Sequence, residues 1–256
     1  MKVALKVVGG LLLVLVVAAG VLFVHVRSQM ATPQGVRIDA EPVATGVLAK
    51  YSYCWIGRTP HGAFLVDAGP DPSGEELLAE LKLQGIPVDA VHTVLLTHGH
   101  EDHWGAAALF PKAKVMVGPG ELTTRGERGV MPALLEALMR LVGPRPRMPA
   151  TLSELKGGET LDVDGVQVKV VSVPGHTQGA LAYLISGILF TGDSVMARPD
   201  GSLDLGPRLF CEDAEQNRRS LEKLRELDFD RIADGHAGLT VDAKTRLESF
   251  LGKPPR

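Results

Sequence analysis

Cysteine is nearly absent from this chain of 256 residues, which contains only Cys54 and Cys211. Neither has a second cysteine at the spacing of thiolate metal ligands, so the sequence offers no zinc–thiolate site. A disulfide between the two is compatible with a protein outside the cytoplasm. We favour two buried free thiols, because free cysteine commonly behaves as a small apolar side chain.

An excess of positive charge is also lacking. The formal net charge is -3, and the first 27 residues carry Lys2, Lys6 and Arg27 but no acidic side chain. The remaining chain carries 24 basic and 30 acidic side chains. Such an acidic body provides no basic surface for a phosphate backbone, so we expect no nucleic-acid partner.

The segment Val7–Val26 contains no acidic, lysine or arginine side chain. A helix of this length, rising about 1.5 Å per residue, would just cross a hydrocarbon core of about 30 Å. Lys2 and Lys6 precede the segment, which favours a cytoplasmic N-terminus. We therefore predict that residues 1–30 provide one transmembrane helix and that the rest of the chain lies outside the cytoplasm, in the periplasm.

A cleavable signal sequence is the alternative, because small residues occur in VVAAG. Cleavage would release residues 31–256 as a secreted protein. The apolar run is longer than the core of a usual signal sequence and continues past VVAAG, and no lipobox-like cysteine is present. We therefore favour an uncleaved membrane anchor.

Residues 31–256 alternate strand-like and helix-like patterns, which predicts one α/β domain. Two parts of this region resemble each other, since each has hairpins, a strand ending in an aspartate, a helix, and a short strand ending in a histidine. The two aspartates are Asp67 in FLVDAG and Asp193 in LFTGD. This pseudo-repeat predicts two sheets packed face to face, with helices outside and loops converging at one edge.

Turn residues and periodicity locate several elements. Asp-Gly at 164–165 and Ser-Gly at 186–187 are typical of tight hairpins. Residues 74–85 have helical spacing, with Gly85 as the expected end of the helix. Further helices are predicted at 214–227, at 241–251 and in a segment that begins at Asp102.

Residues 118–150 interrupt this alternation. They are bounded by glycine and proline and contain an apolar helical core, Met131 to Val142. This core is interpreted either as a helix packed on the body or as a lid over a site, and the pattern does not distinguish the two.

The segment THGHEDHWG, residues 97–105, places four metal-competent side chains within six residues: His98, His100, Asp102 and His103. A chain that leaves a strand at His98 can aim His98 and His100 to the same side, because strand residues alternate with period 2. Asp102 and His103 then follow at the start of a helix. An isolated histidine is usually a surface or core residue, but that interpretation does not explain four such groups together.

Three further candidates each follow a predicted strand and lie beside glycine: His176, Asp193 and His236. Zinc-type cations prefer imidazole and carboxylate ligands at about 2.0–2.2 Å. Seven ligands are too many for one tetrahedral ion, but they suit two ions that share a carboxylate and a water. His61 and His92 are interpreted as bystanders.

The motif in THGHEDHWG resembles the HxHxDH motif of the metallo-β-lactamase superfamily, and the three later candidates follow in that family's order. The resemblance covers nearly all of residues 40–240, and Asp193 makes it similar to the glyoxalase II-type hydrolases rather than to true β-lactamases. It implies a four-layer αββα sandwich with the site at one edge. The chain continues for only twenty residues after His236. It lacks the long helical extension of glyoxalase II, so glutathione-thioester specificity is not favoured.

The resemblance also implies how the ligands are shared. The first metal would be held by His98, His100 and His176. The second would be held by Asp102, His103 and His236. Asp193 would bridge the two ions, which are expected to be zinc, with iron or manganese as alternatives.

A site of this kind predicts a metal-dependent hydrolase of a small-molecule thioester, lactone, amide or related ester. Two cations would lower the pKa of a bridging water and supply hydroxide to attack a polarised carbonyl. Asp102 would orient this nucleophile and could accept its proton. Asp67 is interpreted either as a hydrogen-bond partner of a ligating histidine or as a turn-capping residue.

Three other functions stay open as alternatives. An iron-dependent oxidoreductase similar to sulfur dioxygenases is disfavoured by the pair Asp102 and His103, and the common diiron variant has Glu where this chain has His100. A β-lactamase is a narrower alternative, because a fold does not set the substrate. A tethered binding module that keeps metal for structure is not indicated, since no ligand is missing. The sequence does not indicate an oligomeric state.

Overall fold

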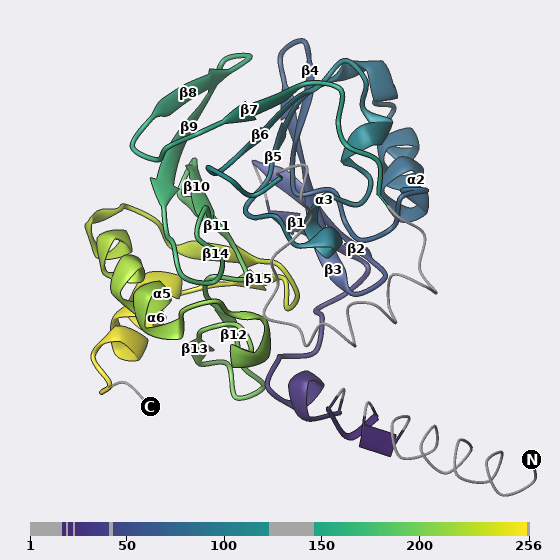
Figure 1. Ribbon diagram of the computed structural model, residues 1–256. Coiled ribbons are helices and arrows are strands. Elements are labelled where there is room, and N and C mark those ends of the chain that lie inside the picture. The colour runs from purple at the N-terminus through teal and green to yellow at the C-terminus, as the bar shows by residue number, and fades with distance from the viewer. Residues whose placement is uncertain (1–16, 19, 23, 41–42, 123–145, 255–256) are drawn as a thin grey trace, which may run out of the picture.

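The computed structural model describes residues 17–18, 20–22, 24–40, 43–122 and 146–254 (Figure 1). Seven strands form one sheet in chain order: β1 (Arg37–Ala40), β2 (Ala44–Ala49), β3 (Ser52–Thr59), β4 (Gly62–Val66), β5 (Val91–Leu95), β6 (Lys114–Val117) and β7 (Leu152–Glu154). The strands β1 to β4 pair antiparallel, whereas β4 to β7 pair parallel. The parallel part brings the ends of β4, β5 and β6 to one edge of the sheet.

A second sheet has the order β15-β14-β11-β10-β9-β8. Its strands are β8 (Thr160–Val163), β9 (Val166–Ser172), β10 (Leu181–Ile185), β11 (Ile188–Gly192), β14 (Arg231–Asp234) and β15 (Leu239–Thr240). The pair β11 and β14 is parallel, and the other pairs are antiparallel. A separate small ribbon is formed by β12 (Met196–Ala197) and β13 (Leu203–Asp204).

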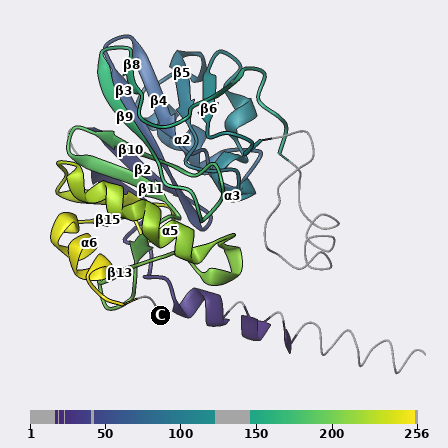
Figure 2. The ribbon, with the colours of Figure 1, turned by 60° about the vertical axis from the view of Figure 1, so that its left-hand side comes forward.

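Helices cover the outer faces of both sheets, as Figure 2 shows. The helices α2 (Glu75–Leu83) and α3 (Glu101–Trp104) lie on the first sheet, and α5 (Ala214–Leu221) and α6 (Ala243–Leu251) lie on the second. The described residues also contain the short 3-10 helices η1 (Val88–Ala90), η2 (Ala107–Leu109), η3 (Arg208–Phe210) and η4 (Glu222–Glu226).

The buried apolar residues form three clusters, one for each contact between neighbouring layers. Alternate residues of β3 separate two of them: Cys54 and Ile56 face α2, whereas Tyr53 and Trp55 face the second sheet. The third cluster lies between the second sheet and α5 and α6, where Leu189 of β11 is buried. The predicted αββα arrangement of two sheets between outer helices is therefore confirmed.

Several predicted boundaries are confirmed, and one helix is shorter than expected. Helix α2 ends at Leu83, and Gly85 follows with a left-handed φ of 68°. The helix expected from Asp102 begins one residue earlier and lasts four residues. It stops at Gly105, where a Cβ would lie 2.6 Å from the carbonyl oxygen of Pro70.

The described part of the N-terminal segment includes a helical stretch at residues 24–28, which lies away from the two sheets (Figure 1). Among the residues that the structure describes, no helix is long and apolar enough to cross a membrane. The predicted transmembrane helix is thus not supported, and most of Val7–Val26 lies outside the described residues. The predicted helical core of the 118–150 segment also lies outside them.

Candidate metal centre

The seven residues predicted as ligands come together at one edge of the sandwich. The segment 97–105 follows β5, His176 follows β9, Asp193 follows β11, and His236 follows β14. Five of the seven side chains are buried, whereas His100 and Asp102 are only partly buried. The site is therefore formed by loops after strands of both sheets, and it is open on the side of His100 and Asp102.

Three imidazoles form one group, which we call the histidine triad: His98, His100 and His176. Nε2 of His98 lies 3.0 Å from Nδ1 of His100, and Nε2 of His176 lies 3.1 Å from the same Nδ1. Three ring nitrogens thus converge without a carboxylate among them. A shared cation satisfies three converging nitrogen lone pairs, because neutral imidazole is a good metal ligand.

A second group, which we call the mixed group, consists of Asp102, His103 and His236. An oxygen of Asp102 lies 3.4 Å from Nε2 of His236 and 3.7 Å from Nε2 of His103. Asp193 faces both groups. Its oxygens lie 3.1 Å from Nε2 of His236, 3.4 Å from Nε2 of His103 and 3.8 Å from Nε2 of His176.

Unpartnered buried atoms test whether these residues fit metal ions. Nε2 of His103 and Oδ1 of Asp193 are buried and face each other, yet neither makes a hydrogen bond in the described structure. A buried polar atom without a partner is costly, and divalent cations of the zinc type bind imidazole nitrogens and carboxylate oxygens. The donor set and its orphaned atoms therefore fit divalent cations.

Burial and neighbouring histidines control protonation in the histidine triad. Burial lowers the pKa of His176 to about 3, with the nearby histidines acting in the same direction. The pKa of His98 lies well below its usual value for the same reasons, and burial also lowers the pKa of His100. All three imidazoles are therefore neutral at pH 7.

Carboxylates reverse this effect in the mixed group. Burial by itself lowers the pKa of His236, but Asp193 and Asp102 outweigh it and raise that pKa to about 9. Burial is likewise outweighed at His103, where the carboxylates of Asp102, Asp193 and Asp67 hold the pKa well above its usual value. In turn, His236 and His103 hold the pKa of Asp193 well below its usual value despite burial.

Groups around the site fix the orientation of the rings. Asp67 Oδ2 lies 2.8 Å from Nδ1 of His103, and the same carboxylate accepts hydrogen bonds from the backbone and hydroxyl groups of Thr97. The hypothesis that Asp67 contacts one of these histidines is therefore confirmed. Nδ1 of His236 lies 2.8 Å from the backbone carbonyl oxygen of Tyr51.

Sequence patterns missed several of these supporting residues. Asp234 is fully buried and accepts hydrogen bonds from the backbone N–H groups of His236 and Ala237. The ADGH pattern contains this aspartate two residues before the histidine, which is the spacing of an Asx-turn. The ADGH pattern could therefore have predicted the role of Asp234. No pattern could have predicted the contact with the Tyr51 carbonyl, because every residue has a backbone carbonyl.

Residues left out of the predicted site lie apart from it. His61 and His92 are exposed and belong to none of the candidate ligand groups. Cys54 and Cys211 are both buried free thiols, which confirms the interpretation favoured from the sequence.

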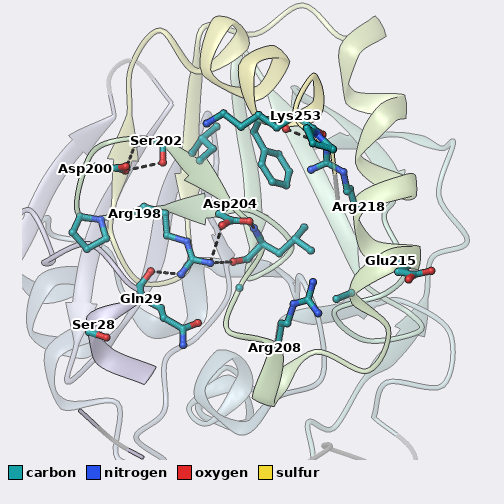
Figure 3. Close-up of a pocket in the computed structure, with 17 residues that line it drawn as sticks. Ser28, Gln29, Arg198, Asp200, Ser202, Asp204, Arg208, Glu215, Arg218 and Lys253 are labelled. Atoms are coloured by element: carbon teal, nitrogen blue, oxygen red, sulfur yellow. Dashed lines mark hydrogen bonds and ion pairs between the residues drawn. The ribbon is translucent and has the colours of Figure 1, made fainter. Parts of the chain in front are cut away.

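A separate pocket of about 610 Å³ lies beside residues 28–29 and the β12–β13 ribbon (Figure 3). Its wall includes Gly206, where a Cβ would lie 2.7 Å from the backbone oxygen of Asp193 and 3.4 Å from Nδ1 of His176. Arg198 pairs with Asp204 at 3.2 Å and also donates to backbone carbonyls. Arg198 is thus satisfied within the protein, and none of the seven candidate ligands lines this pocket.

Comparison with curated proteins finds hydroxyacylglutathione hydrolases. Those of Aeromonas hydrophila and Dechloromonas aromatica are 32% and 31% identical to this chain over 197 and 183 residues. The matched regions cover 75% and 72% of this chain, but 63% and 56% of those proteins. The chain therefore spans only part of the length of the curated relatives that it matches.

Solved structures and a family model agree on the fold. A metallo-beta-lactamase family protein of Thermus thermophilus matches with a TM-score of 0.60 and 25% identity, covering 84% of this chain and 77% of that one. A metallo-beta-lactamase superfamily protein of Sulfolobus tokodaii matches with a TM-score of 0.59 and 22% identity, covering 88% and 83%. Residues 48–236 match the family model of the metallo-beta-lactamase superfamily. This chain belongs to the metallo-beta-lactamase superfamily.

Proposed function

We propose that the protein is a hydrolase dependent on two zinc ions and that it cleaves a thioester or a related ester, lactone or amide. The observation that carries the proposal is the convergence of the histidine triad and the mixed group on Asp193. Two sets of three ligands sharing one carboxylate are the donor set of a two-metal hydrolase. The names of the curated relatives support a thioester in particular.

Bound cations would supply two effects here, a lowered pKa for a water molecule and polarisation of the substrate carbonyl. The protein's own groups must then orient the reactants. Asp102 suits this role because its side chain is 21% exposed, whereas those of Asp193 and His236 are 8% and 10% exposed. We assign Asp102 to orient the attacking water and to accept its proton. Substrate would approach from the open side, beside His100 and Asp102.

Metal content and hydrolysis measured together test this proposal. The protein should bind two zinc ions per chain, and turnover of a thioester should disappear with a chelator and return with zinc. The panel should include a lactone and a β-lactam, because the fold does not choose among them. A protein that binds two zinc ions but turns over none of these substrates would contradict the hydrolase. Bound iron with oxygen consumption would favour the oxidoreductase.

His100→Ala separates catalysis from a structural use of the metal. His100 belongs to the histidine triad but is only partly buried, so its truncation should leave the fold in place. Loss of turnover with an unchanged circular dichroism spectrum is the expected result. Full turnover in this variant would contradict the assigned ligand set.

We also propose that Val7–Val26 anchors the protein in a membrane with residues 31–256 outside the cytoplasm. The proposal rests on the apolar composition of this run and on Lys2 and Lys6 before it. The full chain should resist extraction from membranes by alkaline carbonate and keep its N-terminal mass. Release of the protein, or a shortened N-terminus, would favour the cleaved and secreted form.

A further inference from the structure

Glu121 lies outside every candidate ligand group, yet it connects the two loops that carry the histidine triad. It lies in a turn after β6, where its backbone N–H donates to the carbonyl oxygen of Gly118, and its side chain is half-buried. Its Oε2 accepts a hydrogen bond of 2.6 Å from the backbone N–H of Gly99, which lies between His98 and His100. Its Oε1 accepts one of 2.6 Å from the N–H of Gly179, three residues after His176.

One carboxylate therefore joins segments that are far apart in the sequence. Gly99 and Gly179 are separated by 80 positions, and the ligands beside them belong to loops after β5 and β9. Hydrogen bonds from N–H groups to a carboxylate are stronger than those between neutral groups. Removing the carboxylate would leave two backbone donors without their acceptor, at the place where the two loops meet.

Close packing holds this junction in one arrangement. A Cβ on Gly99 would lie 2.7 Å from the Glu121 carbonyl oxygen, and a Cβ on Gly179 would lie 2.6 Å from the Pro119 carbonyl oxygen. The opposite side of Gly99 is also fixed, because the indole Nε1 of Trp104 donates to its carbonyl oxygen at 3.0 Å. The peptide between His98 and His100 is thus held from both sides.

We propose that Glu121 is a positioning residue for the ion held by the histidine triad. It acts through Gly99 and Gly179 rather than by touching the ion, and no contact connects it to the mixed group in the described structure. Partners that orient metal ligands typically change metal affinity by about 10- to 100-fold when they are removed. The proposal rests on the metal site of the proposed function but not on its substrate or reaction.

Glu121→Gln is the variant that tests this role. The amide has the same shape, but it keeps one acceptor oxygen and presents an NH₂ group to the other N–H donor. In a zinc titration against a chromophoric chelator, the affinity of one of the two ions should fall by about 10- to 100-fold while that of the other is unchanged. Glu121→Asp, which keeps both oxygens on a shorter side chain, should fall between the wild type and Gln.

Glu154→Gln is the matched control. Glu154 accepts a hydrogen bond of 3.0 Å from Gly120 in the same turn, but its side chain is exposed and does not reach the ligand loops. Both zinc affinities should stay at the wild-type value in this variant. In a His176→Ala background, where the triad ion is already lost, Glu121→Gln should have no further effect on the remaining ion.

Three results would overturn the inference. Glu121→Gln could bind both ions as tightly as the wild type, or it could weaken both equally together with a lower unfolding temperature, which would indicate a merely structural role. A wild-type chain that takes up no zinc would overturn it together with the proposed hydrolase. By contrast, a wild type that binds two ions but hydrolyses nothing would contradict only the hydrolase, so the two proposals fail separately.

Discussion

The histidine triad and the mixed group lie side by side, but they differ in charge. The triad consists of three imidazoles, and burial lowers the pKa of each of them. The mixed group contains Asp102 and faces Asp193, and these carboxylates raise the pKa of both of its histidines. The same residue type is therefore neutral in one half of the centre and protonated in the other at pH 7.

The difference in charge means that the two halves of the metal-free centre must bind a cation in different ways. A metal ligand must be deprotonated, so histidines that are already neutral can bind a cation without releasing a proton. The protons of His103 and His236 must leave before the mixed group can bind one. The carboxylates that raise these pKa values also attract the incoming cation. We therefore expect the two halves to respond differently to mutation and to pH.

The largest expected effect is the loss of both ions in Asp193→Ala, compared with the loss of one ion in His176→Ala. Asp193→Ala should abolish tight binding of both ions and reduce hydrolysis to the level without enzyme, because Asp193 contacts His176 as well as His103 and His236. His176→Ala should abolish only the triad ion. Metal analysis after gel filtration, followed by a thioester assay, measures both results.

His92→Ala is the control for these two variants, because His92 is exposed and lies apart from the ligand groups. It should keep two ions and full activity. Retention of one tightly bound ion in Asp193→Ala would show that the two groups bind independently and would contradict the role of Asp193 as a ligand shared by both.

The next largest effect is on the stability of the metal-free protein, to which His176 and His236 should contribute with opposite dependence on pH. Below pH 6.5 the unfolded chain protonates His176, but the folded protein does not until about pH 3. Stability is thus lost as the pH falls, by about 2 kcal/mol at pH 5 from this residue. For His236 the folded pKa is raised to about 9, so its stabilisation is present below pH 6.5 and is lost as the pH rises through 9, by about 3 kcal/mol.

Urea unfolding of the apo protein between pH 5 and pH 10 measures both limbs. His176→Asn should make the acid limb shallower, with His98 and His100 still contributing to it, and should leave the alkaline limb in place. His236→Asn should make the alkaline limb shallower, with His103 still contributing to it, and should leave the acid limb in place. A single variant that flattens both limbs would show that the groups titrate as one unit.

Sequence patterns predicted those residues of the metal centre that stand close together in the sequence or directly after a predicted strand. The residues of THGHEDHWG are consecutive, and His176, Asp193 and His236 each follow a strand that its own composition indicates. Those patterns located all seven residues that the structure gathers. The length of the helix after His100 was not predictable from local spacing. The helix ends at Trp104, and the next residue, Gly105, packs closely against the backbone of Pro70, a contact that only the fold creates.

Sequence patterns also could not predict the contacts between side chains and backbone groups of distant segments. Glu121 accepts from Gly99 and Gly179, and these contacts span 22 and 58 positions. His236 contacts the carbonyl oxygen of Tyr51 across 185 positions. A backbone group looks the same at every position, so such partners become visible only when the fold brings the segments together.

Asp67→Asn should weaken the ion of the mixed group by about 10- to 100-fold, since Asp67 Oδ2 contacts Nδ1 of His103. The amide keeps one oxygen for the Thr97 backbone N–H but removes the carboxylate that orients the ring. Zinc titration against a chelator measures the effect. Because Glu121→Gln should weaken the other ion, the two variants form a pair with opposite selectivity. Equal weakening of both ions by either variant would remove the distinction between the groups.

The smallest effect is expected from replacing Ser52 or Ser220, two buried serines whose hydroxyl groups donate hydrogen bonds to the backbone of the ligand loops. Ser52 Oγ donates to the backbone carbonyl of Asp102 at 2.7 Å. Ser220 Oγ lies 2.8 Å from two backbone carbonyl oxygens, those of Asn217 and of Pro174, two residues before His176, which share its single hydroxyl proton. Each serine-to-alanine change removes a similar hydrogen bond and should lower the free energy of unfolding by about 1 kcal/mol. Their effects on zinc should nevertheless differ, with Ser52→Ala weakening the mixed-group ion and Ser220→Ala the triad ion, each by only a few-fold. If Ser52→Ala and Ser220→Ala weakened both zinc ions to the same extent, each serine would support the whole site rather than the half nearest to it.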